Sequence, residues 1–210
     1  MPIPLYVTSL RILIPLLIFK WPLLGILAST FMDIKDWKLI KFQSSTDYLF
    51  YQNWDKALDI YYLAIALFVT RSWKDKLAQK LAFFLFFYRL TGDLLFFFTQ
   101  NRAFLFFFPN FFESFFVFYL LFTFIFRKAK IITSQKSWWI LLIFLGLPKL
   151  IHEYFLHIIK TQPWQIYNLG QKLGFSGEME ANINFYSQGL IFYILPFALG
   201  LYFLKKASDR

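Results

Sequence analysis

Long runs of apolar residues follow one another along this chain and limit the folds that it can adopt. A helix of about 20 apolar residues crosses the hydrocarbon core of a bilayer. Five stretches reach or approach that length, at residues 61–69 with their flanks, 81–98, 103–126, 137–159 and 185–204. Hydrophobic residues make up 59% of the chain and charged residues only 16%, so it is far more apolar than an ordinary globular domain. The sequence therefore predicts an all-α integral membrane protein.

The N-terminal apolar stretch, residues 3–32, is interrupted by Lys20, Trp21 and Pro22. A proline at this place predicts either two short helices joined by a tight turn or one long kinked helix. Together with the five later stretches this gives a polytopic helical bundle of six or seven transmembrane helices. We find no internal repeat and no second domain, so residues 1–210 are predicted to form a single integral-membrane domain.

Basic residues gather between the apolar stretches and give the chain a net charge of +10. In a membrane protein this pattern predicts contact with anionic lipid headgroups and phosphorylated substrates. No nucleic-acid-binding motif is present, so nucleic acid is not an expected partner. The chain has no Cys, which excludes disulfides and thiolate metal sites.

Four aspartates stand at the ends of two apolar segments in a chain that otherwise has few acids. Asp33 and Asp36 are three residues apart, and Asp55 and Asp59 are four apart, so each pair lies on one face of a helix. Two such faces turned together would form a cage of four carboxylates. Oxygen-only ligands of this kind suit Mg²⁺ or Mn²⁺, and the anions would repel one another without a cation.

The alternative is that these acids lie in the headgroup zone and pair with nearby lysines. Lys35, Lys38, Lys41 and Lys56 are close enough in sequence to do so. The two interpretations differ in whether the four carboxylates converge on one point.

The first sixty residues resemble the CDP-alcohol phosphatidyltransferases. The family pattern D-x-x-D-G-x-x-A-R, eight residues, then G-x-x-x-D-x-x-x-D keeps all four of its acids here, in D-I-K-D at 33–36 and D-K-A-L-D at 55–59. The N-terminal segment keeps Thr8, Arg11 and Pro15 of the form that usually precedes this pattern. The chain departs from it at its glycine and Ala-Arg positions, which are Trp37, Ile40 and Lys41, and in an interval that is one residue longer. The resemblance covers roughly residues 4–65.

The resemblance implies a membrane phosphotransferase of phospholipid biosynthesis. Such an enzyme moves a phosphatidyl or similar phosphoalcohol group from a CDP-linked donor to an alcohol acceptor. Asp33, Asp36, Asp55 and Asp59 would hold two Mg²⁺ or Mn²⁺ ions, and Asp59 would be the general base on the acceptor hydroxyl. Lys41 would keep a positive charge for substrate phosphate where the family has Arg. The expected partners are membrane lipid, donor and acceptor, with a homodimer as one allowed state, and the expected location is the plasma membrane.

Further ionisable residues lie inside the apolar stretches. Arg89 and Asp93 are four apart, which predicts either an internal ion pair, with Gly92 allowing close helix approach, or an Arg89 that meets an acceptor phosphate. His152 and His157 flank Glu153 but are five apart, whereas zinc-binding histidines of this motif are four apart on one face. We therefore expect these histidines to be structural or to line the acceptor site.

A non-catalytic membrane protein is the second functional class that the sequence allows, as a degenerate relative, a lipid-binding subunit or a small transporter. Charged groups within the apolar stretches, such as Glu113 and His152, keep transport open. The orientation is also open. The resemblance places the acids at the cytoplasmic side, whereas the basic loops after residues 69 and 126 favour a cytoplasmic position for themselves.

Overall fold

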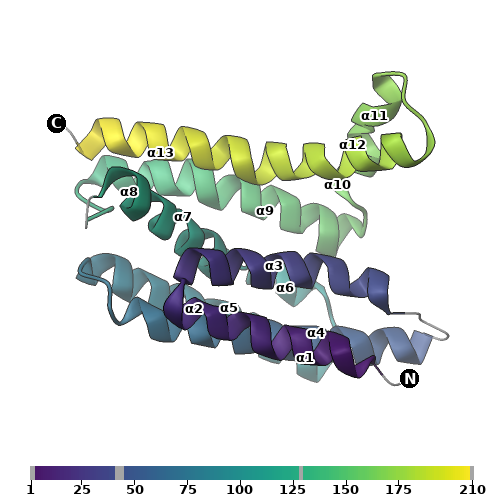
Figure 1. The fold of residues 1–210 in the computed structure, drawn as a ribbon. Helices are drawn as coiled ribbons and strands as arrows, with labels where there is room; N and C mark the ends of the chain where they lie inside the picture. The colour runs from purple at the N-terminus through teal and green to yellow at the C-terminus, as the bar shows by residue number, and fades with distance from the viewer. Residues whose placement is uncertain (1–2, 41–44, 128–129, 209–210) are drawn as a thin grey trace.

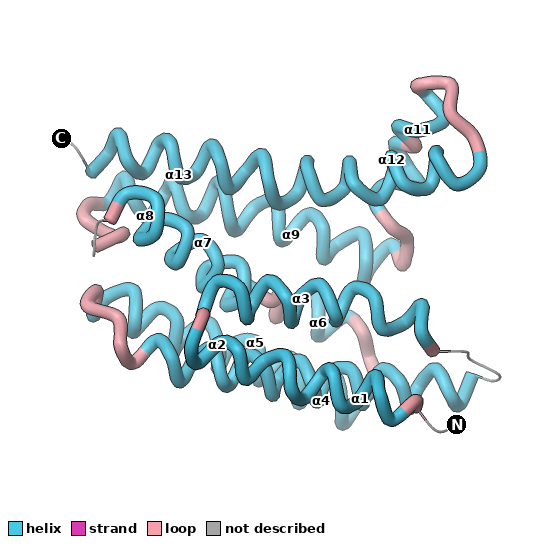
Figure 2. The backbone as a smooth tube through the Cα atoms, viewed as in Figure 1, coloured by secondary structure: helices cyan, strands magenta, loops and turns pink. Residues whose placement is uncertain are grey.

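The computed structural model describes residues 3–40, 45–127 and 130–208, and all regular secondary structure in these ranges is helical (Figure 1). Helices α1 to α5 lie together along one side of the molecule, and α9 and α13 lie along the other (Figure 2). Helix α7 contacts α3, α4 and α5 on the first side and α13 on the second. The all-α fold expected from the sequence is confirmed.

The N-terminal stretch forms a helical hairpin. Helices α1 (Leu5–Leu13) and α2 (Leu17–Lys20), joined by a 3₁₀ turn, form the first arm, and α3 (Pro22–Leu39) forms the second. Trp21 has the non-helical dihedrals φ −131° and ψ 77°, and Pro22 starts α3, where its missing N–H costs no helical hydrogen bond. A Cβ on Gly25 would lie 2.4 Å from the backbone nitrogen of Ile18, so only glycine allows the arms this close approach. Of the two arrangements predicted, the structure has the tight turn.

The middle of the chain forms two further long helices and a short one before the central helix. These are α4 (Ser45–Thr70), α5 (Lys76–Thr99), α6 (Ala103–Phe107) and α7 (Phe111–Phe126). Asp75 caps α5 by accepting hydrogen bonds from the backbone N–H groups of Leu77 and Ala78, each 3.1 Å long. Asn110 caps α7 in the same way through the N–H of Glu113.

The C-terminal part contains two long helical segments joined by short helices. The first consists of α8 (Gln135–Leu141), a π-helical turn (Leu142–Gly146), α9 (Leu147–Tyr154) and a second π-helical turn (Phe155–Ile159). Short helices α10 (Pro163–Tyr167) and α11 (Leu169–Lys172) connect it to the second, which consists of α12 (Gly177–Gly189), a π-helical turn (Leu190–Ile194) and α13 (Leu195–Ser208).

Four of the described helical segments are long and apolar enough to cross a membrane, at Lys76–Thr99, Ala103–Phe126, Gln135–Ile159 and Gly177–Ala207. The structure supports a helical membrane protein, but not the predicted count of six or seven spans. The N-terminal hairpin and α4 do not meet this measure of length and composition. The reason is partly the charge they carry, since α3 contains Asp33 and Asp36 and α4 contains Asp55, Lys56 and Asp59.

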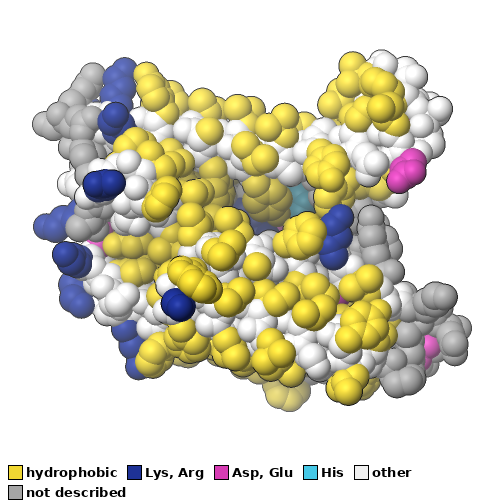
Figure 3. Space-filling model, viewed as in Figure 1, with side chains coloured by type: hydrophobic (Ala, Val, Ile, Leu, Met, Phe, Trp, Pro, Cys, Tyr) yellow, Lys and Arg dark blue, Asp and Glu magenta, His cyan; other side chains and the backbone are white. Residues whose placement is uncertain are grey.

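The core is built largely from phenylalanine around α7. Phe112, Phe116, Phe118 and Phe122 of this helix are completely buried. Other aromatic and aliphatic side chains are exposed on the outer faces, among them Phe98 and Phe124, and apolar atoms cover much of the visible surface (Figure 3). Lipid can cover such a surface, whereas water would not stabilise it.

Candidate cation site between α3 and α4

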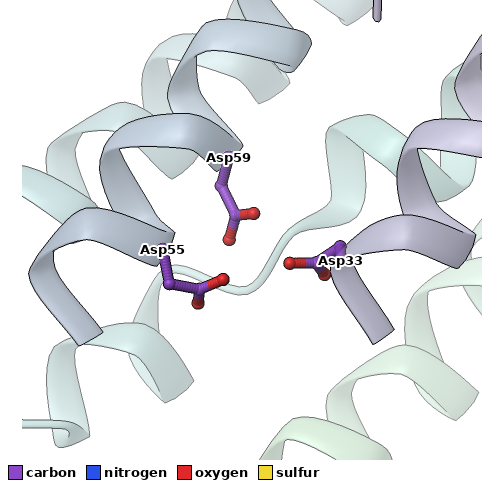
Figure 4. A group of neighbouring side chains, drawn as sticks. All are labelled: Asp33, Asp55 and Asp59. Carbon is purple, nitrogen blue, oxygen red and sulfur yellow. The ribbon is translucent and has the colours of Figure 1, made fainter. Parts of the chain in front are cut away.

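Three aspartates from two antiparallel helices converge near the end of the bundle that holds the N-terminus. Asp33 comes from α3, and Asp55 and Asp59 come from α4 one turn apart, so that all three side chains point into the same space (Figure 4). One carboxylate oxygen from each lies within 4.8 Å of the others. The spacing along each helix therefore has the geometric consequence expected from the sequence.

The fourth acid, Asp36, lies deeper in the same site. Its side chain is fully buried, and its Oδ1 accepts a 2.6 Å hydrogen bond from the hydroxyl of Tyr51. By contrast the Asp33 side chain is 28% exposed, so the site is open to small ions on the Asp33 side.

Arg11 of α1 places its guanidinium among the four carboxylates. Nη1 pairs with Asp33 and lies 3.1 Å from Asp36 Oδ2, and Nη2 lies 3.3 Å from Asp55 Oδ1 and 3.1 Å from Asp59 Oδ1. The Arg11 side chain is only 3% exposed. A buried guanidinium is stable only with such partners, and it lies within ion-pair distance of one oxygen from every acid.

Lys56 supplies a second cation from α4 itself. Its Nζ lies 2.9 Å from Asp55 Oδ2 and 2.5 Å from Asp59 Oδ2. Four carboxyl groups thus share two cations. We call these six residues, Arg11, Asp33, Asp36, Asp55, Lys56 and Asp59, the acid cage.

The sequence predicts the four acids as site residues but not Arg11, and it indicates Lys56 only as a pairing partner. Arg11 lies 22 residues from Asp33 and 48 from Asp59, so no local spacing connects them. One signal was available, because a single arginine inside an apolar helix needs a buried partner. Among the other lysines of the alternative interpretation, Lys35 packs over the rings of Phe31 and Phe185.

The structure describes only some of the positions at which the chain departs from the family pattern. Lys41, the expected phosphate contact, lies outside the described residues, as does the side chain of Trp37. Ile40 is 5% exposed and packs in a small cluster with Val7 and Met32. Tyr51 and Trp54 pack against the same cluster, and Tyr51 also donates to Asp36, so Ile40 lies in the apolar layer beside the site.

Arg89 and Asp93 form the buried ion pair that was one of the two predicted outcomes. Arg89 Nε donates to Asp93 Oδ2 at 3.0 Å, and Nη2 lies 2.9 Å from Asp93 Oδ1. Nη1 donates to the backbone oxygen of Phe108 at 3.1 Å. A Cβ on Gly92 would lie 2.3 Å from Cβ of Phe108, so the expected close approach at this glycine is present. A substrate contact by Arg89 stays a prediction.

The two histidines have different partners. His157 Nε2 lies 2.8 Å from Glu153 Oε2, and the other oxygen of Glu153 pairs with Lys149 at 2.8 Å. His152 instead contacts Gln188 at 2.9 Å and Tyr193 at 3.3 Å. Glu113 faces the core, where it accepts hydrogen bonds from Thr30 of α3 and from Asn110. These contacts fit the expectation of structural histidines.

Comparisons of the chain with protein-family models, with curated proteins and with solved structures find no match.

Proposed function

We propose that the protein is a membrane phosphotransferase that resembles the CDP-alcohol phosphatidyltransferases. It would move a phosphatidyl or similar phosphoalcohol group from a nucleotide-diphosphate donor to an alcohol acceptor in phospholipid biosynthesis. The observation that carries the proposal is the convergence of Asp33, Asp55 and Asp59 from two helices to within 4.8 Å. These acids, with Asp36, are the same four residues on which the resemblance rests.

The ligand atoms of the acid cage are of the kind that divalent cations prefer. All four acids offer carboxylate oxygens, which Mg²⁺ and Mn²⁺ prefer. Asp36 Oδ2 is buried and accepts no hydrogen bond, although it lies near Arg11, so one strong acceptor has coordination capacity left. Two ions, when bound, would supply charge neutralisation for a diphosphate donor. Their binding requires Arg11 to give up part of its contacts.

The chain's own groups have distinct roles in this proposal. Asp59 takes the proton from the acceptor hydroxyl, whose oxygen then bonds to the phosphorus that carries the alcohol. The bond from that phosphorus to the bridging oxygen breaks, and the nucleoside monophosphate leaves with the electron pair. Lys41 and Arg89 contact substrate phosphates, and Arg89 would exchange part of its pairing with Asp93 to do so.

The site would lie in the plasma membrane, among lipid, donor and acceptor. In the proposed arrangement the two arms of the N-terminal hairpin and α4 also cross the bilayer, which together with the four segments described above gives seven spans. A homodimer is compatible with this arrangement.

A non-catalytic role is the second candidate, and one specific observation favours it. Arg11 and Lys56 together contact all four acids, so the acid cage has cationic partners of its own. A degenerate relative could keep the acids as a structural ion-pair network. In that case the same residues would hold the N-terminal hairpin to α4 and no substrate would react.

Release of CMP separates the two candidates. Purified protein in detergent or nanodiscs is mixed with CDP-diacylglycerol and a panel of alcohols, with Mn²⁺ or Mg²⁺ in one arm and EDTA in the other. The transferase proposal expects CMP only in the arm with a divalent cation and an acceptor. Absence of CMP with every alcohol, together with absence of Mn²⁺ binding by calorimetry, would favour the non-catalytic role.

A further inference from the structure

A hollow lies at the end of the bundle where α4 ends and α3 begins, away from the acid cage. It is a cavity of about 370 Å³, broadly open to the outside, between the start of α3, the end of α4 with the loop that follows it, and the last turns of α7. Pro22, Val69 and Leu120 form its apolar wall, and Lys74 and Arg127 stand among the lining residues that carry charge. None of these residues belongs to the acid cage.

The floor of the cavity is built from aromatic rings held firmly in place. Trp73 and Tyr119 stack with ring centroids 3.7 Å apart and planes 17° apart, and both are buried. Asp75 anchors the loop beside them, because it caps α5 and also accepts a 2.8 Å hydrogen bond from the backbone N–H of Ile131. These contacts hold the aromatic side of the cavity in place.

The two cations of the cavity have exposed side chains, and no carboxylate of the described residues pairs with either. Further lysines and arginines surround them, and dark blue side chains gather at this end of the molecule (Figure 3). In the loops and helix ends here the basic residues are Arg71, Lys74, Lys76, Lys80, Arg127, Lys130, Lys136, Lys205 and Lys206. Asp75 is the only acid among the described residues of these segments, and it is buried. We call this region the basic end.

We propose that the cavity at the basic end binds the headgroup of an anionic phospholipid, with the phosphate between Lys74 and Arg127. Exposed apolar side chains stand next to the lining residues in the same end turns of α3, α4 and α7, among them Leu24, Phe68 and Phe124. A soluble phosphate would use only the cations, whereas a phospholipid also covers this apolar surface with its chains. The inference does not depend on the chemistry of the acid cage.

The test counts lipids that stay bound. Purified protein in neutral detergent receives equimolar phosphatidylglycerol and phosphatidylcholine, and native mass spectrometry measures which lipid the protein retains. The wild type should retain phosphatidylglycerol in preference to phosphatidylcholine. The double substitution K74Q and R127Q should weaken phosphatidylglycerol binding about thirtyfold, since each Lys or Arg beside an anionic lipid contributes roughly a fivefold factor in affinity. R127K alone should keep the preference.

A matched control removes the same charge elsewhere at the basic end. Lys136 and Lys206 are exposed and do not line the cavity, so the double substitution K136Q and K206Q should leave phosphatidylglycerol retention within about twofold. Equal losses in both double variants would overturn the proposal in favour of diffuse attraction, and no loss in either would overturn it as well. Displacement of the lipid by millimolar inorganic phosphate alone would show that free phosphate is the ligand, which also contradicts it.

Discussion

The two ends of the bundle hold their charges in opposite ways. In the acid cage the charges are buried or half-buried, and each side chain lies among partners from α1, α3 and α4. At the basic end the cations are exposed, and Asp75 is the only described acid among them. Buried charges must satisfy one another at short range, whereas exposed ones act on whatever approaches from outside. The first end is thus suited to a fixed site and the second to contact with lipid headgroups.

The two ends must also face opposite sides of the membrane. Which side each end faces is the prediction with the largest expected effect. The termini lie at opposite ends (Figure 1), and Asp33 and Asp36 of the acid cage belong to the second half of α3, which runs toward the end that holds the N-terminus. The proposed nucleotide-linked donor is cytoplasmic, so we expect the acid-cage end to face the cytoplasm, although the loop charges favour the basic end there. The chain has no Cys, so single substitutions can be labelled without background.

Intact cells can be labelled with a maleimide that does not cross the membrane, so that a cysteine at one end reacts fully and a cysteine at the other end does not react. A cysteine at Lys136 should react from outside, and one at Glu178, at the other end, should react only after the membrane is permeabilised. The reverse pattern would remove the nucleotide-linked donor from the proposal. It would leave either a lipid-linked diphosphate or the non-catalytic role.

Substitution of Asp59 tests whether the acid cage is catalytic. Asp59→Asn keeps the shape of the side chain but loses the base, so CMP release should fall by about 10² to 10⁴-fold. Asp47→Asn changes the same charge in the first turn of α4, away from the cage, and serves as the control. Equal activity of Asp59→Asn and the wild type would contradict the assignment of this residue.

Substitution of Arg11 tests whether this guanidinium stabilises the four carboxylates of the acid cage. Arg11→Gln leaves four carboxyl groups with Lys56 alone, which should lower the free energy of unfolding by about 3 kcal/mol. Mn²⁺ should restore much of this loss if the cage binds divalent cations, because the ion replaces the missing charge. Thermal unfolding in detergent, with and without Mn²⁺, measures both effects.

Arg71→Gln is the matched control, since Arg71 is exposed at the basic end. It should change neither the unfolding temperature nor its response to Mn²⁺. If Arg11→Gln lowers the unfolding temperature and Mn²⁺ does not raise it again, the cage is an ion-pair network only.

The sequence predicted those groupings of charged residues that depend on neighbours along one helix. The pair Asp55 and Asp59 and the pair Arg89 and Asp93 are four residues apart, and helical periodicity alone brings each pair to one face. The position of Arg11 depends on the packing of α1 against α3 and α4, which no local pattern encodes. The contact of Thr30 with Glu113, 83 residues apart, was missed for the same reason.

The count of membrane spans was less predictable than the fold class. Apolar composition indicates that the chain lies in a membrane. The charged residues of the acid cage, however, interrupt the apolar runs of α3 and α4, so these helices are not recognised as spans by length and composition. The cavity at the basic end could not be predicted either. Trp73 and Tyr119 are 46 residues apart in sequence, and only the packing of α7 against the loop after α4 stacks them.

Replacing single lysines at the basic end by uncharged glutamine should have the smallest effect on stability among these predictions. Lys74→Gln and Lys136→Gln remove exposed charges that have no carboxylate partner among the described residues, so each should change the free energy of unfolding by less than about 0.5 kcal/mol. Thermal unfolding in neutral detergent checks this. In anionic nanodiscs the wild type should gain stability over Lys74→Gln, because bound lipid stabilises only the folded state. A large loss from Lys74→Gln in neutral detergent would show that this cation supports the fold itself, and the contrast between the two ends would then fail.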